Sequence, residues 1–115
     1  MPRRQRLPRT ARLLSGAQFK AVFAGRRSCG NELFRVHFVP SDQARLGMAV
    51  SRRVSNKAID RNRIRRRIRE TFRLRRDRLA AMDYVVVARS AARHADPRVL
   101  NAKLEQLWQR FSDNP

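Results

Sequence analysis

The stretch that constrains this chain most runs Arg61-Asn62-Arg63-Ile64-Arg65-Arg66-Arg67-Ile68-Arg69-Glu70. The same character continues to Arg78, so residues 61–78 hold ten arginines against two acids, Glu70 and Asp77. Within it, Ile64, Ile68, Phe72 and Leu79 recur at helical spacing and predict a helix with a narrow apolar stripe. Neighbouring guanidinium groups repel one another, and a bound polyanion removes that repulsion by replacing the counterions. The stretch therefore predicts a helix that packs on the rest of the protein and meets a polyanion.

The composition of the whole chain agrees with a small folded protein that binds nucleic acid. The chain has 115 residues, which suits one domain, and its hydrophobic fraction of 42% is too high for a disordered basic tail. Its net charge is +19, from 28 basic and 9 acidic residues, and all but three of the basic residues are Arg. Arg binds phosphate through two nitrogens and stacks on bases. Nucleic acid is therefore the leading partner, and an anionic membrane is the weaker alternative.

Cysteine content and hydropathy indicate the cytoplasm. The single Cys29 excludes an internal disulfide and suits a reducing compartment. No apolar run approaches the length of a membrane span, and the basic N-terminus lacks the apolar core of a signal peptide. We therefore expect a cytoplasmic protein with no membrane partner, in which residues 1–14 form a flexible basic arm.

Local patterns predict one helix and three strands ahead of the arginine-rich helix. A capping box of Ser15 and Gln18 starts the first helix, and Gly25 ends it. The strands are expected over residues 26–29, 32–39 and 45–52, with a turn at Gly30-Asn31 between the first two. The arginine-rich helix has three alternative caps, Ser55, Asn56 and Asp60.

The C-terminal part of the chain predicts a buried strand and a last helix. Residues 84–89 form a short, nearly continuous apolar run, which is typical of a strand buried on both faces. Asp96 caps the last helix with Pro97 at its first position. Its inner face carries Leu100, Leu104, Leu107 and Phe111, with Trp108 beside them. The element order α-β-β-β-α-β-α predicts an α+β fold, a small two-layer sandwich, in a single domain over residues 15–112.

The residues that carry enzyme chemistry are scattered along the chain. His37 and His94 are far apart, and neither has a metal-ligand spacing. The nine acids show no paired carboxylates of the kind that a two-metal nuclease uses. Folding could still bring the two histidines together, so a site of the protein's own stays open as an alternative. We expect this chain to bind, not to catalyse, and to hold no metal tightly.

Aromatic residues beside the positive charge have two interpretations. Phe19 and Phe23 share one face of the first helix with Val22, which favours a place in the core. Next to so many cations they could instead stack on unpaired bases. His37 lies on the strand face opposite Phe34, where it either borders a groove or is an ordinary surface histidine.

The segment from the third strand into the arginine-rich helix resembles the signature of the bacterial ribonuclease P protein family. Its parts are a strand that ends in Arg52-Arg53, a short basic link, Arg61-Asn62-Arg63, the second basic pair Arg65-Arg66, and Arg69-Glu70. Supporting matches are Phe19-Lys-Ala-Val-Phe23, the Gly30-Asn31 hairpin and Asp83-Tyr-Val-Val-Val-Ala-Arg89, so the resemblance covers about the whole chain. In the link the family often has Gly before the asparagine, whereas this chain has Ser55-Asn56.

The resemblance implies that residues 15–112 form a single RNA-binding domain of the ribonuclease P protein type, with a fold similar to the second domain of a small-subunit ribosomal protein. It also implies the protein subunit of an endonuclease in which RNA is the catalyst and holds the magnesium. The implied partners are the ribonuclease P RNA and precursor tRNA, whose 5′ leader is removed, and no protein oligomer is required. The residues implied to contact the catalytic RNA are Arg61, Asn62, Arg63, Arg65, Arg66 and Arg69. Those implied to line a cleft for the leader are Phe19, Phe23 and Arg53, with His37 as a further candidate.

Two other functions remain as alternatives to this one. The first is a ribosomal or other structural RNA-binding protein, which would bind RNA without turnover. The second is a nuclease with a catalytic site of its own. Both would use the same basic surface, so composition does not separate them.

Overall fold

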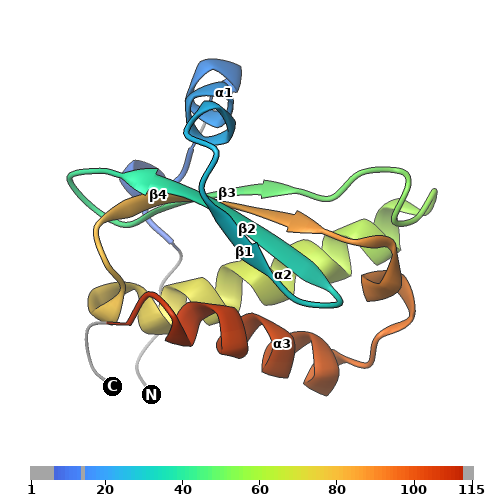
Figure 1. Ribbon diagram of the computed structural model, residues 1–115. Coiled ribbons are helices and arrows are strands. Elements are labelled where there is room, and N and C mark those ends of the chain that lie inside the picture. The colour runs from blue at the N-terminus through green and yellow to red at the C-terminus, as the bar shows by residue number, and fades with distance from the viewer. Residues whose placement is uncertain (1–6, 14, 113–115) are drawn as a thin grey trace.

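The computed structural model describes residues 7–13 and 15–112. Its elements in chain order are η1 (Arg9–Ala11), α1 (Gly16–Ala24), β1 (Ser28–Gly30), β2 (Phe34–Pro40), β3 (Arg45–Ala49), α2 (Ala58–Arg75), η2 (Arg76–Arg78), β4 (Met82–Ala88), η3 (Ser90–His94) and α3 (Pro97–Gln109), where η marks a 3-10 helix (Figure 1). Apart from the 3-10 helices, this is the predicted order α-β-β-β-α-β-α. The predicted α+β class is confirmed.

The last strand, β4, occupies the interior of a four-stranded sheet with the order β1-β2-β4-β3. It pairs antiparallel with β2 and parallel with β3, so α2 carries the chain between two parallel neighbours. Tyr84, Val85 and Val86 of β4 are all fully buried. A strand with neighbours on both edges and helices on both faces has no solvated side, which explains its continuous apolar run.

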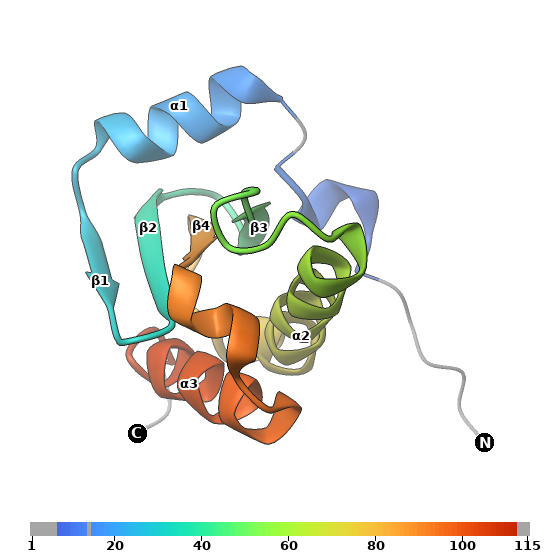
Figure 2. The same cartoon turned by 90° about the vertical axis from the view of Figure 1, so that its right-hand side faces the viewer.

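Helices cover both faces of the sheet, with α2 and α3 on one face and the shorter α1 on the other (Figure 2). The two predicted layers are the sheet and the α2–α3 pair, and α1 packs outside them. The larger core cluster lies between those layers and includes Trp108, Tyr84 and Phe34. Trp108 is fully buried, and its Nε1–H donates to Thr71 Oγ1 at 2.9 Å, which joins α3 to α2. The core positions predicted for Trp108 and Phe111 are confirmed.

The apolar stripe of α2 lies against this core. Ile64, Ile68 and Phe72 are all fully buried. Leu79 is also buried, but its predicted place in the same helix is wrong, because α2 ends at Arg75 and η2 then turns the chain toward β4. The stripe therefore consists of three residues on successive turns of α2.

The start of α2 differs from the sequence prediction. The helix begins after Lys57, and none of the three predicted cap residues caps it with a side chain. Instead, the Ser55 hydroxyl donates to Asp60 Oδ2 at 2.7 Å and accepts from the Lys57 amide at 3.1 Å, which closes the turn ahead of the helix. The Ser55 hydrogen bond lowers the pKa of Asp60, and nearby basic side chains add to this effect.

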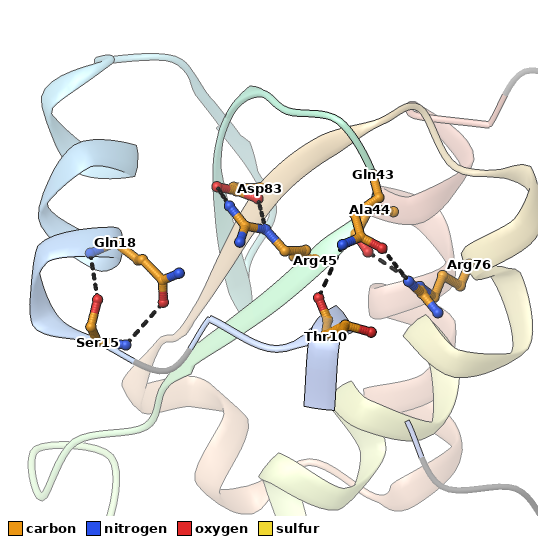
Figure 3. A network of polar contacts seen from close by, with 8 residues as sticks. All are labelled: Thr10, Ser15, Gln18, Gln43, Ala44, Arg45, Arg76 and Asp83. Carbon is orange, nitrogen blue, oxygen red and sulfur yellow. Dashed lines mark hydrogen bonds and ion pairs between the residues drawn. The ribbon is translucent and has the colours of Figure 1, made fainter. Parts of the chain in front are cut away.

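The ends of α1 and α3 follow the sequence prediction. Ser15 Oγ accepts from the Gln18 amide at 3.2 Å, and Gln18 Oε1 accepts from the Ser15 amide at 3.0 Å, which completes the capping box (Figure 3). Gly25 ends α1. Asp96 Oδ1 accepts from a backbone amide in the first turn of α3, next to Pro97. These side chains satisfy amides that have no partner within the helix.

The first three strands are shorter than predicted. β1 begins at Ser28, and the hairpin turn falls at residues 31–33 and not at Gly30-Asn31. The reason is the Asn31 side chain, whose Oδ1 accepts from two amides of the turn at 3.1 Å each. β3 ends at Ala49 because the chain then turns back toward α2.

The predicted flexible arm over residues 1–14 is wrong for residues 7–13, the part of it that the structure describes. Leu7, Ala11 and Leu13 are buried, and the Leu13 amide donates to the Leu46 carbonyl at 2.9 Å. Residues 7–13 thus pack on the domain and contact β3, because three apolar side chains among the basic ones find sites in the core. Residues 1–6 and 14 lie outside the described part of the chain.

Replacing Gly47 by Ala tests how closely α1 and the N-terminal segment pack on β3. A Cβ at Gly47 would lie 2.7 Å from Cζ of Phe19 and 3.2 Å from Cδ1 of Leu13, so these side chains would have to move. Overpacking of this kind costs about 1–3 kcal/mol. We expect Gly47→Ala to lower the free energy of unfolding, measured in urea, by that amount. Gly16→Ala is the matched control, because a Cβ there meets no atom within 4 Å.

The control should leave stability unchanged or raise it slightly, since Ala favours a helix over Gly. Equal stabilities of the Gly47→Ala protein and the unsubstituted protein would contradict the close packing of Phe19 on β3.

Candidate nucleic-acid interface

The side of α2 that faces away from the core carries exposed polar and basic groups. Ile64 and Ile68 point toward the sheet, and at 100° per residue Asn62, Arg66 and Arg69 lie on the opposite side. All three are exposed, and we call them the outer face of α2. Among the described residues, Arg66 and Arg69 have no hydrogen-bond or ion-pair partner. Their guanidinium groups are therefore available to a ligand.

Two other predicted RNA-contacting residues, Arg61 and Arg63, are turned toward the protein. Arg63 donates to the carbonyl oxygens of Arg93 at 2.8 Å and of Ala95 at 3.1 Å, in the segment that leads into α3. Arg61 donates to the Ser55 carbonyl at 2.9 Å. Both guanidinium groups satisfy carbonyl oxygens of irregular segments. The structure thus gives these arginines a role in the fold that the sequence did not indicate.

Arg65 lies between the outer face and the sheet. It is half-buried, and it donates to Asn62 Oδ1 at 3.2 Å and to the Val50 carbonyl at 3.4 Å. The first bond orients the Asn62 amide, whose NH₂ group remains a donor. Arg65 therefore supports the outer face as well as adding charge to it.

Arginines in the C-terminal half of the stretch are also tied to protein groups. Arg73 forms an ion pair with Glu70 at 3.1 Å. Arg76 donates to the Ala44 carbonyl at 3.2 Å and to Gln43 Oε1 at 3.0 Å (Figure 3). The ten arginines of residues 61–78 therefore do not form one uniform cationic surface.

A second candidate surface lies on the other face of the sheet, beside α1. Phe23 and His37 make an edge-to-face contact with 4.7 Å between ring centroids, and Phe23 is 40% exposed. Phe19, one turn earlier, packs instead on the small core cluster that contains Val22 and Val85. The core interpretation therefore applies mainly to Phe19, while Phe23 presents its ring to solvent as the stacking interpretation requires.

Two effects favour the neutral form of the His37 imidazole. Burial lowers the pKa of His37, and the positive charge of Arg35 on the same strand lowers it further. A neutral imidazole offers one N–H donor and one nitrogen acceptor. The Phe23–His37 pair therefore combines an aromatic ring with two hydrogen-bonding atoms of opposite kind.

Arg53 stands apart from this pair. It is exposed in the turn that follows β3, where its amide donates to Ser51 Oγ at 3.3 Å. Among the described residues, the structure records no contact between its side chain and Phe23 or His37. Of the four residues predicted to contact the leader, the structure brings only Phe23 and His37 into contact with each other.

Groups suited to metal binding are dispersed over the described residues. Nowhere among them do three or more His, Cys, Asp or Glu side chains come together in a way that could hold a metal ion. The buried Asp83 forms a bidentate ion pair with Arg45, in which both N–O distances are 2.7 Å (Figure 3). The Asp83 carboxylate is therefore already paired within the fold.

None of the described helices has the length and apolar character to cross a membrane.

A groove between α2 and α3 was not anticipated from the sequence. Arg66, Arg67 and Leu74 of α2 and Asn101 of α3 are among the residues that line it. Asn101 is remote from the arginine-rich stretch in the sequence, and no periodicity relates the two. The groove begins at Arg66, so it adjoins the outer face of α2.

A small α+β fold with an arginine-lined outer helix, and with the exposed Phe23 paired to His37 across the sheet, has the features expected of a basic nucleic-acid-binding protein. Residues 7–112 match the family model described as Ribonuclease P. A "Ribonuclease P protein component" from Thioalkalivibrio sulfidiphilus is 41% identical over 110 residues, which cover 94% of this chain and 92% of the relative. The chain belongs to the ribonuclease P protein family.

Solved structures of the same kind share the fold. The RNase P protein of Staphylococcus aureus superposes with a TM-score of 0.82 at 29% identity, over 87% of this chain and 94% of that one. The RNase P protein of Thermotoga maritima gives a TM-score of 0.74 at 29% identity, over 95% and 99% of the two chains. The family resemblance seen in the sequence is therefore confirmed at the level of the fold.

Proposed function

We propose that this chain binds the catalytic RNA of ribonuclease P through the outer face of α2, and the 5′ leader of precursor tRNA beside Phe23 and His37. Membership of the family makes it a subunit of an RNA-processing endoribonuclease. The observation that carries the RNA contact is the pair Arg66 and Arg69, both exposed and both without a partner among the described residues. Removal of the leader would leave the mature 5′ end of tRNA.

The outer face of α2 suits the backbone of a folded RNA. Arg66 and Arg69 are spaced three residues apart on one helix, so they can contact neighbouring phosphates. Guanidinium groups bind phosphate oxygens through two parallel hydrogen bonds. The Asn62 amide adds a donor for a phosphate, a 2′-hydroxyl or a base edge. A rigid helix held by its buried stripe keeps these groups in place before RNA arrives.

The Phe23–His37 pair suits an unpaired strand. An exposed ring provides a stacking surface for a base without strong preference for its identity. The neutral His37 adds hydrogen bonds without adding a charge. A leader is a flexible polyanion that the catalytic RNA repels, and a chain of net charge +19 offsets that repulsion.

Magnesium belongs to the RNA in this proposal. When bound there, it supplies the activation of water and the stabilisation of charge for hydrolysis of a phosphodiester. The protein binds and orients the two RNAs, and its compartment is the cytoplasm, as the single Cys29 suggests.

Reconstitution tests the proposed function. The purified protein alone should leave precursor tRNA intact, and adding it to a bacterial ribonuclease P RNA with magnesium should accelerate cleavage at the mature 5′ end. Cleavage by RNA-free protein would instead indicate a nuclease site of its own. Binding to RNA with no effect on cleavage would indicate a structural RNA-binding protein.

The salt dependence of RNA binding should distinguish the arginines of α2 that contact RNA from those that bind protein carbonyls. Each phosphate contact contributes about 0.7–0.9 to the slope of log K against log salt. We expect Arg66→Ala and Arg69→Ala each to flatten the slope by about that amount, with the melting temperature unchanged. Arg63→Ala should lower the melting temperature, because the carbonyls of Arg93 and Ala95 lose their donor.

The control for total charge is Arg78→Ala, because Arg78 is exposed and lies beyond α2. An equal slope change in Arg78→Ala and Arg66→Ala would mean that charge, and not the outer face, determines binding.

Phe23 and Phe19 should differ in their effects although they lie one turn apart. Phe23→Ala removes an exposed ring and should weaken binding of precursor tRNA by about 1–3 kcal/mol, with little effect on mature tRNA. Phe19→Ala removes a packed ring and should cost about 3 kcal/mol of stability, the low end for a buried Phe because this ring is half-buried. Affinity for both tRNAs and thermal melting are the measurements. If Phe23→Ala leaves leader discrimination intact, the proposed leader site is wrong.

A further inference from the structure

The groove between α2 and α3 is a cavity of about 430 Å³. The two helices lie side by side in both views of the fold (Figures 1 and 2). The groove is lined by residues that include Arg66, Arg67, Glu70 and Leu74 from α2, with Asn101 and Glu105 from α3. The volume lies within the usual range of small-ligand sites, and the lining mixes donors, acceptors and an apolar side chain.

Three polar atoms in this groove are buried without a hydrogen bond among the described residues, and one of them, Glu105 Oε2, is in an ion pair with Arg75. Arg67 Nε and Asn101 Oδ1 are both buried, and neither makes a hydrogen bond among the described residues. Buried polar atoms are nearly always paired, so an unpaired donor and an unpaired acceptor in one groove call for an explanation. A ligand that supplies an acceptor to Arg67 and a donor to Asn101 would satisfy both.

The acids of the groove do not supply these partners. Glu70 is paired with Arg73, and Glu105 with Arg75. The carboxylates are thus neutralised by arginines on the same side of the molecule. Arg66 and Arg67 remain, so the groove has an excess of positive charge and attracts an anion.

Continuity with the outer face of α2 identifies the source of that anion. Arg66 belongs both to the outer face and to the groove, so an RNA strand on the outer face passes the mouth of the groove. Leu74 is 68% exposed at α2, where it offers an apolar surface for a ring. A nucleotide carries a phosphate, a flat apolar ring and amino donors on one small group.

We propose that the α2–α3 groove holds one unpaired nucleotide of the ribonuclease P RNA. Its phosphate binds Arg66 and Arg67, its base rests on Leu74, and an amino group of the base donates to Asn101. The inference rests on the proposed function, because it assumes that RNA occupies the outer face.

Two substitutions test the groove in the full chain. Asn101→Leu keeps the number and branching of the side-chain heavy atoms and removes the unpaired oxygen, and Arg67→Met keeps the apolar stem and removes the guanidinium. Each should weaken binding to a bacterial ribonuclease P RNA about 2- to 10-fold at fixed ionic strength, as loss of one hydrogen bond does. Asn101→Leu should not lower the melting temperature, since it removes a buried polar atom that has no partner. A purely structural role would lower that temperature and leave RNA affinity unchanged.

Controls separate the groove from the outer face. Arg78→Met removes the same charge outside the groove, and Ala102→Leu adds a leucine at an exposed position of α3. Asn62→Ala and Arg69→Met weaken the outer face itself. If these two weaken RNA binding and the groove variants match their controls, the groove proposal is overturned and the proposed function stands. If no variant of either set weakens binding, both fail.

A photoactivatable group at position 101 gives a second, independent measurement. Asn101→Cys in a Cys29→Ala background carries the probe at one position, because Cys29 is the chain's only cysteine. Cross-linking to one unpaired nucleotide of the RNA supports the proposal. Cross-links spread over duplex regions, or no cross-link to RNA while the complex is intact, overturn it.

Discussion

The packing of α2 on the sheet is the interaction on which the rest of this structure depends. Ile64, Ile68 and Phe72 are fully removed from water, and each such side chain contributes about 1.5–3 kcal/mol through burial. Trp108 fixes α3 to the same helix through its bond to Thr71. The remaining positions of α2 are mostly arginines that repel one another, so this narrow stripe holds the helix in place. Its burial also decides which arginines can reach a ligand.

The arginines that bind other groups of the protein have a different physical role. Arg63 and Arg61 satisfy backbone carbonyls of irregular segments, and Arg73 neutralises Glu70. Each of these contacts offsets part of the repulsion by placing a cation beside a partial or full negative charge. The protein can therefore be strongly basic and still folded, while Arg66 keeps its guanidinium for a ligand.

The two candidate surfaces lie on opposite faces of one sheet. The outer face of α2 is on the side of the two long helices, and the Phe23–His37 pair is on the side of α1 (Figure 2). A sheet whose central strand is buried on both faces separates these surfaces rigidly. This geometry suits a protein that contacts two RNA segments at once. The difference between the two sets of groups matches the proposed function, in which a folded RNA presents phosphates and an unpaired leader also presents bases.

The sequence by itself determined the order of elements, the family and the kind of partner. The order of elements and the kind of partner follow from local spacing and composition, because the capping box at Ser15, the apolar run of β4 and the arginine-rich stretch each span only a few residues. The family follows from the resemblance of the segment around Arg61-Asn62-Arg63 to a known signature. Only the tertiary structure decided that Arg63 donates to backbone carbonyls while Arg66 faces solvent. It also decided that Phe19 packs on the core while Phe23 is exposed, and that residues 7–13 join the core. The α2–α3 groove is likewise a feature that only the tertiary structure decided. Periodicity shows which side of a helix is buried, but the partners of its other sides come from segments far away in the chain.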